Sequence, residues 1–100
     1  MVAMESTVID HTLVFSFSER LDTLGAMSLQ KEIVDTIAAQ DNSLAVTFDF
    51  AGVEYISSGF IRVLMLVVRM KGKNFSIVNI NPAVRKILLM AGLDRIITMA

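Results

Sequence analysis

The stretch that decides the fold lies in the middle of the chain and reads Val53-Glu54-Tyr55-Ile56-Ser57-Ser58-Gly59-Phe60-Ile61-Arg62-Val63-Leu64. Its first four residues are extended in pattern, and Phe60 opens a long apolar segment, to Met70, that is compatible with a helix. The serines between them are favoured at a helix start, because their hydroxyls accept hydrogen bonds from free N–H groups. We therefore expect a strand end, a serine loop and a helix.

Before this stretch, strand and helix patterns alternate. Leu44 to Phe50 is nearly continuous in apolar residues, which predicts a central strand buried on both faces. Upstream of that strand, Asp22-Thr23 offers a helix cap, and apolar residues recur at helical spacing from Leu24 to Ile37. This pattern predicts an amphipathic helix that ends near Gln40.

The N-terminal segment predicts a β-hairpin. Thr7 to Asp10 and Thr12 to Phe17 are short stretches of β-branched and aromatic residues, and Asp10-His11 between them is typical of a tight turn.

After the serine helix the same alternation continues. Phe75 to Ile80 predicts another strand, and Asn81-Pro82 is a typical cap and first residue of a helix that runs to about Met90. Ala91-Gly92 stops that helix, and Leu93 to Met99 predicts a last short strand. Strands that alternate with helices require crossover connections. We expect one α/β domain over residues 1–100, with an N-terminal hairpin, a mostly parallel central sheet and helices packed on it.

Composition narrows the classes of function. The chain has 100 residues, 54% of them hydrophobic, which is enough for one core. No apolar run reaches the roughly 20 uncharged residues of a membrane-spanning helix, no secretion signal opens the sequence, and cysteine is absent. The net charge of −1 disfavours nucleic acid as a partner. We expect a cytoplasmic protein without membrane insertion.

Few residues could carry catalysis. The single histidine, His11, is expected in a solvated turn, and the five glycines form no phosphate-binding pattern. No acidic or histidine residues have metal-ligand spacing, and Asp49 and Glu54 are better explained as a solvated strand end than as a carboxylate pair. We therefore expect no enzyme, no cofactor and no metal site.

The serine pair allows two interpretations. Plain helix capping is the simpler one, and it contributes about 1 kcal/mol. A phosphate here would meet the positive end of the helix dipole and add about −2 charge to a binding surface without unfolding the domain. Local sequence leaves both interpretations open.

Four segments together carry a family resemblance. The segment Val53 to Leu64, then Asn81-Pro82-Ala83-Val84-Arg85, then Ala91-Gly92-Leu93, preceded by Arg20-Leu21-Asp22, resembles in order and spacing the STAS domain of bacterial anti-sigma factor antagonists. The resemblance runs from about Val8 onward. It implies a protein that binds an anti-sigma factor that is also a serine kinase, is released when that kinase phosphorylates it, and is restored by a PP2C-type phosphatase.

The resemblance also assigns residues. Ser58 falls on the phosphoacceptor position, with Ser57 as the alternative, since Ser57 stands where many members have aspartate. It implies a partner-binding surface of Glu54, Ser57, Ser58, Gly59 and Arg62. Phe60 would place a bulky ring near the loop.

A second class of function stays open at this point. A STAS domain could also be a constitutive interaction subunit, such as a stressosome scaffold component or the small subunit of a lipid transporter, without any switch. The sequence leaves the oligomeric state open.

Overall fold

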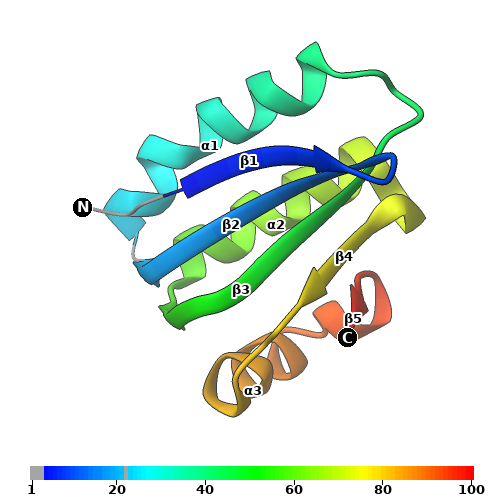
Figure 1. Ribbon diagram of the computed structural model, residues 1–100. Helices are drawn as coiled ribbons and strands as arrows, with labels where there is room; N and C mark the ends of the chain where they lie inside the picture. Colours follow the sequence, from blue (N-terminus) through cyan, green and yellow to red (C-terminus); the bar gives the residue numbers. More distant parts are fainter. Residues whose placement is uncertain (1–3, 22) are drawn as a thin grey trace.

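The computed structural model describes residues 4–21 and 23–100 and confirms the predicted order of strands and helices. The elements, labelled in Figure 1, are β1 Met4–Ile9, β2 Thr12–Leu21, α1 Thr23–Ala39, β3 Ala45–Ile56, α2 Ser58–Lys71, the 3-10 turn η1 Gly72–Asn74, β4 Phe75–Val78, α3 Pro82–Met90, the 3-10 turn η2 Leu93–Arg95 and β5 Thr98–Met99.

The strands form one sheet in the order β1-β2-β3-β4-β5. Only β1 is antiparallel to its neighbour, and the other neighbouring pairs are parallel. Right-handed crossovers between strands that advance in one direction place every connecting helix on the same face. Figure 1 accordingly shows α2 behind the sheet, and buried residues of α1, α2 and α3 belong to one hydrophobic cluster.

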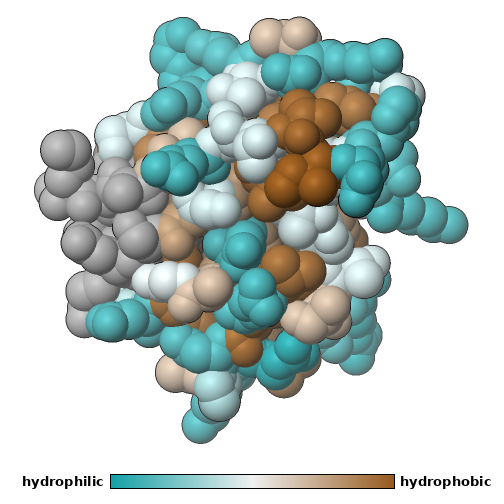
Figure 2. All heavy atoms as spheres, viewed as in Figure 1, coloured by the Kyte–Doolittle hydropathy of each residue, from teal (hydrophilic) through white to brown (hydrophobic). Residues whose placement is uncertain are grey.

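Burial on β3 corrects one prediction. Val46, Phe48 and Phe50 are buried under the helices, whereas Ala45, Thr47 and Asp49 between them are only partly buried. The expected burial of both faces is therefore wrong, because no described helix covers the second face. Figure 2 shows this helix-free side as a mixture of hydrophilic and hydrophobic surface.

The core is aromatic. It contains all the phenylalanines of the chain, which make a network of tilted and edge-to-face ring contacts between β2, β3, β4 and α2: Phe15, Phe17, Phe48, Phe50, Phe60 and Phe75. Such pairs add about 0.5–1.5 kcal/mol each beyond the burial of apolar area.

The predicted hairpin is confirmed. Asp10 and His11 have φ values of 48° and 63°, as expected for a two-residue turn of type I′, and His11 is exposed. The second strand is longer than predicted and includes Arg20 and Leu21. The predicted helix cap at Asp22 lies outside the described residues.

Strand ends differ from the sequence pattern in three places. β3 continues through Ala51-Gly52, where irregularities in its register with β2 accommodate the exposed pair. The predicted strand to Ile80 ends at Val78, because Asn79 has a φ of 57°. The predicted last strand is mostly a turn, since the Ile97 N–H donates to the Leu93 carbonyl over 2.9 Å and both side chains are buried at helical spacing.

Candidate functional site

The serine loop lies at the carboxyl end of the central strand β3. Ile56 immediately before it and Phe60 just after it are fully buried, so the loop is held on both sides by the core. In parallel sheets the carboxyl ends of strands are the usual place for binding sites, because the following loops are free to vary there.

The two serines have different environments. Ser57 is the N-cap of α2, with extended backbone angles of φ −96° and ψ 169°. Its Oγ accepts a hydrogen bond from the Phe60 N–H at 3.4 Å, and only 8% of the residue is exposed. The Ser57 hydroxyl is therefore used in capping and is buried.

Ser58 is the first residue of α2 and is exposed to solvent. The N–H groups of a first helical turn and the helix dipole both favour negative charge nearby. A phosphate on Ser58 would point away from the core at the end of the helix where it is best tolerated.

The rest of α2 divides into a buried and an exposed side. Its buried residues are Phe60, Val63, Leu64 and Val67. The exposed side carries Ser58, Arg62, Met65 and Arg69, at spacings of four, three and four residues.

Residues four apart on a helix are neighbours, so Arg62 lies one turn from Ser58 on the same side. A shallow hollow of about 490 Å³ continues this surface between α1 and α2. It is lined by Gln30, Arg62, Met65, Leu66 and Arg69.

The other predicted partner-binding residues lie at the same junction. Glu54 is exposed near the end of β3, and Gly59 is half-buried in the first turn of α2. Phe60 follows the loop directly, as predicted, and its ring is fully buried beneath it, where it contacts Phe17 at 5.5 Å between ring centres.

Two nearby residues were not among the predicted site residues. Tyr55 is an aromatic residue of β3 with 37% exposure beside Glu54, and aromatic side chains are enriched in protein interfaces. Asn81 caps α3 as predicted, since its Oδ1 accepts from the Val84 N–H at 2.8 Å. Its Nδ2 also donates to the Val53 carbonyl at 2.9 Å, which ties the start of α3 to the end of β3.

The acidic residues near the loop form no pair. Asp49 is half-buried within β3, where its Oδ1 accepts from the Ala51 N–H and from Asn79 Nδ2, each at 3.0 Å. Glu54 is the solvated residue, so the strand-end interpretation holds for Glu54 and is wrong for Asp49. Over residues 4–21 and 23–100, no group of three or more His, Cys, Asp or Glu side chains is placed to hold a metal ion.

Shifted pKa values occur away from the serine loop. The Ser43 N–H donates to the Asp41 carboxylate at 2.8 Å and lowers the pKa of that carboxyl group. The hydrogen bond to Asp35 raises the pKa of Lys31 on the exposed side of α1.

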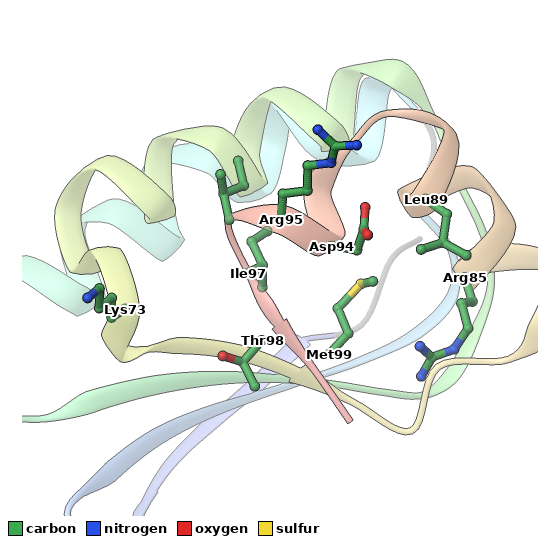
Figure 3. A pocket seen from close by; sticks show the side chains of 9 residues that line it. Lys73, Arg85, Leu89, Asp94, Arg95, Ile97, Thr98 and Met99 are labelled. Carbon is green, nitrogen blue, oxygen red and sulfur yellow. The ribbon is translucent and has the colours of Figure 1, made fainter.

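A separate hollow of about 440 Å³ lies between α3 and β5 (Figure 3). It contains none of the predicted site residues. Its lining includes the cations Lys73, Arg85 and Arg95 and the carboxylate Asp94, with Leu89 and Met99 between them.

No helix in the described part of the chain is long and apolar enough to cross a membrane.

Comparisons with known proteins agree with this fold. A family model described as "Mlab, STAS domain" matches residues 7–98. A search of curated protein sequences finds no significant match.

Solved structures give closer detail. The chain is similar to an anti-sigma factor antagonist from Mycobacterium paratuberculosis, with 25% identity, a TM-score of 0.87, and coverage of 99% of this chain and 85% of that one. A STAS domain protein from Planctomyces limnophilus matches at 19% identity and a TM-score of 0.86, covering 96% of this chain and 87% of its own. The phosphorylated form of the Bacillus cell fate determinant SpoIIAA matches at 18% identity and a TM-score of 0.70, with 98% and 91% coverage.

Proposed function

The chain belongs to the STAS domain family, and from this we propose that it is an anti-sigma factor antagonist of the cytoplasm, switched by phosphorylation of Ser58. In its unphosphorylated form it binds an anti-sigma factor that is also a serine kinase, through the exposed Glu54, Ser58 and Arg62 and the half-buried Gly59. Ser57, also predicted to bind the partner, is buried and supports this surface as the cap of α2. The chain works by binding, and its partners supply the catalysis.

The observation that carries this proposal is the contrast between the two serine hydroxyls. Ser57 is buried and its Oγ caps α2, whereas Ser58 is exposed on the first turn. A kinase must reach the hydroxyl oxygen that attacks the γ-phosphorus of ATP. Accessibility therefore favours Ser58 over Ser57 as the acceptor.

Electrostatics explains how such a modification could release a partner. The kinase transfers the γ-phosphoryl group of ATP to Ser58 Oγ, with release of ADP and a proton, and the phosphoserine carries about −1.5 to −2 charge. Arg62 lies one helical turn away. The phosphate would neutralise this cation and repel acidic groups of the partner, while the helix dipole keeps the fold stable. A PP2C-type phosphatase would restore the hydroxyl by hydrolysis to inorganic phosphate.

The structural relatives are consistent with this role. The Mycobacterium paratuberculosis protein is an anti-sigma factor antagonist. SpoIIAA of Bacillus has been solved in a phosphorylated form.

A constitutive interaction subunit, such as a stressosome scaffold component or a lipid-transporter subunit, is the second candidate. It is favoured by the exposed methionines beside the α1–α2 surface, Met27 with 69% and Met65 with 40% exposure. Such a subunit would bind its partner through apolar contacts that do not depend on the state of Ser58.

The test combines phosphorylation with binding. The protein is incubated with an anti-sigma factor serine kinase from its own organism and ATP, and the added phosphate is located by mass spectrometry. We expect phosphate on Ser58 in the natural chain and in Ser57→Ala, and none in Ser58→Ala. Ser58→Asp should weaken the complex at least about tenfold, which corresponds to 1.4 kcal/mol.

Two outcomes would contradict a switch at Ser58. Phosphate found on Ser57 would make Ser57 the acceptor and overturn the argument from accessibility. An unmodified chain whose complex persists when both serines are replaced by aspartate would establish the constitutive subunit instead.

A further inference from the structure

The strand β1 forms one edge of the sheet and has an uncovered side. It pairs only with β2, and five of its six residues are exposed. Val8 and Ile9 are 49% and 53% exposed, although both are large apolar residues.

The hairpin geometry shows which backbone groups point away from β2. Ile9 pairs with Thr12 across the two-residue turn, and the pair that closes such a turn exchanges both hydrogen bonds. Bonded and unbonded positions then alternate, so Met4, Ser6 and Val8 direct their N–H and C=O groups outward. In the described part of the chain these outward groups have no backbone hydrogen-bond partner.

The two edges of the sheet differ in how well they are protected. β5 at the opposite edge is only two residues long, and charged side chains of η1 and η2 lie around it (Figure 3). Short length and flanking charge are the usual protections of an edge strand, together with proline and inserted lysine. β1 has six residues, no proline, no lysine and Glu5 as its one charge. It is therefore a ready template for another strand.

We propose that β1 pairs with β1 of a second copy of this chain, antiparallel, about a two-fold axis at Thr7. Successive side chains of a strand point to opposite faces of the sheet. Because the helices of both copies lie on the same face of the joined sheet, residues directly opposite each other are both even-numbered or both odd-numbered. The register centred on Thr7 places Ser6 opposite Val8, and these are outward-facing positions that exchange hydrogen bonds.

The same register explains why a second copy fits. Glu5 lies opposite Ile9 of the partner copy, so the carboxylates do not face each other, as like charges directly opposite would destabilise the pair. Pairing also covers part of the exposed Val8 and Ile9, which lie opposite Ser6 and the aliphatic part of Glu5 of the other copy. A two-fold contact of this kind closes at two copies and uses the edge of each once.

The pairing is independent of the proposed switch. β1 is separated from β3, the strand that leads into the serine loop, by β2. A dimer joined through β1 would carry two serine loops, and its failure to form would leave the role of Ser58 untouched.

Cross-linking tests the register directly, because the natural chain contains no cysteine. In the proposed register the two Thr7 residues form a pair without mutual hydrogen bonds, whose Cα atoms lie about 4.5 Å apart. That separation is within the range of a disulfide. Thr7→Cys should therefore oxidise to a species of twice 11.0 kDa that a reductant reverses.

The matched control is Thr98→Cys, an exposed threonine on the opposite edge strand, which should stay monomeric under the same oxidation. Adding Val8→Lys to Thr7→Cys should suppress the cross-link at least tenfold. Circular dichroism should show the fold retained, since Val8 is half exposed.

Sedimentation equilibrium of the natural chain completes the test. A concentration-dependent dimer that Val8→Lys shifts at least tenfold toward monomer would support the proposal. A natural chain that sediments as a monomer at all concentrations, or Thr7→Cys and Thr98→Cys that cross-link equally, would overturn it.

Discussion

The amino and carboxyl ends of the central strand β3 differ in how many polar groups are held in hydrogen bonds. At the amino end of β3, Lys71 Nζ donates to the Leu44 carbonyl at 2.8 Å and to the Asn42 carbonyl at 3.2 Å, and the Ala45 N–H donates to the His11 carbonyl at 3.2 Å. These contacts join the hairpin turn, the loop before β3 and the end of α2.

At the carboxyl end of β3, the side-chain hydrogen bonds described are those of the two helix caps, Ser57 and Asn81. Ser57 and Asn81 satisfy the first N–H groups of α2 and α3, and Ser58 and Glu54 remain exposed. The polar groups named at the amino end are therefore held in hydrogen bonds, whereas Ser58 and Glu54 at the carboxyl end face solvent, which is what the proposed partner surface requires.

The largest loss of stability should come from substitution of Phe60, whose buried ring anchors the serine loop to the core. Its ring also contacts Phe48 and Phe50, so Phe60→Ala should reduce the free energy of unfolding by about 3–5 kcal/mol. Urea denaturation measures this, with Met65→Ala on the exposed side of the same helix as the control, expected to cost less than about 1 kcal/mol. Equal losses in the two variants would show that the loop is not held by the core.

Asn81→Ala should have the second largest effect. It removes the acceptor for Val84 and the donor for Val53, and leaving such partly buried groups unpaired costs about 1–3 kcal/mol. Asn81→Asp keeps the cap and loses only the donor, so its loss should be intermediate. Asn74→Ala, on an exposed asparagine, should stay within about 0.5 kcal/mol. A thermal or urea unfolding series in which all three variants behave alike would rule out the bridging role of Asn81.

Substitutions in the serine pair should have smaller effects, on stability at Ser57 and on binding at Ser58. Ser57→Ala removes the N-cap and should cost about 1 kcal/mol of unfolding free energy, whereas Ser58→Ala, which changes an exposed first-turn residue, should stay within about 0.5 kcal/mol. Binding to the kinase should respond to charge at position 58 and not to loss of the Ser57 hydroxyl. A destabilised Ser58→Ala with a stable Ser57→Ala would reverse the assignment of cap and acceptor.

The smallest effect concerns the amino end and depends on pH. The folded pKa of Asp41 is lowered from its usual 3.8, chiefly by the hydrogen bond from the Ser43 N–H. A lowered folded pKa contributes stability that is present above the unfolded pKa and is lost as the pH falls through the folded one. The melting temperature of the natural chain should therefore exceed that of Asp41→Asn at pH 7, and the gap should narrow as the pH falls below the usual carboxyl pKa of 3.8. A gap that does not change with pH would exclude this carboxylate as its cause.

Much of the fold could be predicted because its signals are local. The Asp10-His11 turn, the Asn81-Pro82 helix start and the apolar spacing of α1 each act over a few residues, and each prediction was confirmed. Two-sided burial of β3 was wrong, and the last short strand was predicted from Leu93 but begins only at Thr98; both points depend on where distant elements pack.

The sequence by itself determined that a serine pair would begin a helix after the central strand. Only the tertiary structure decided which serine caps that helix and which faces solvent. Phe60 enters the core between Phe17 and Phe50, and this contact sets the rotation of α2 about its axis. Adjacent helical residues point about 100° apart. A shift of the helix start by one residue would place Ser58 at the buried cap position in place of Ser57.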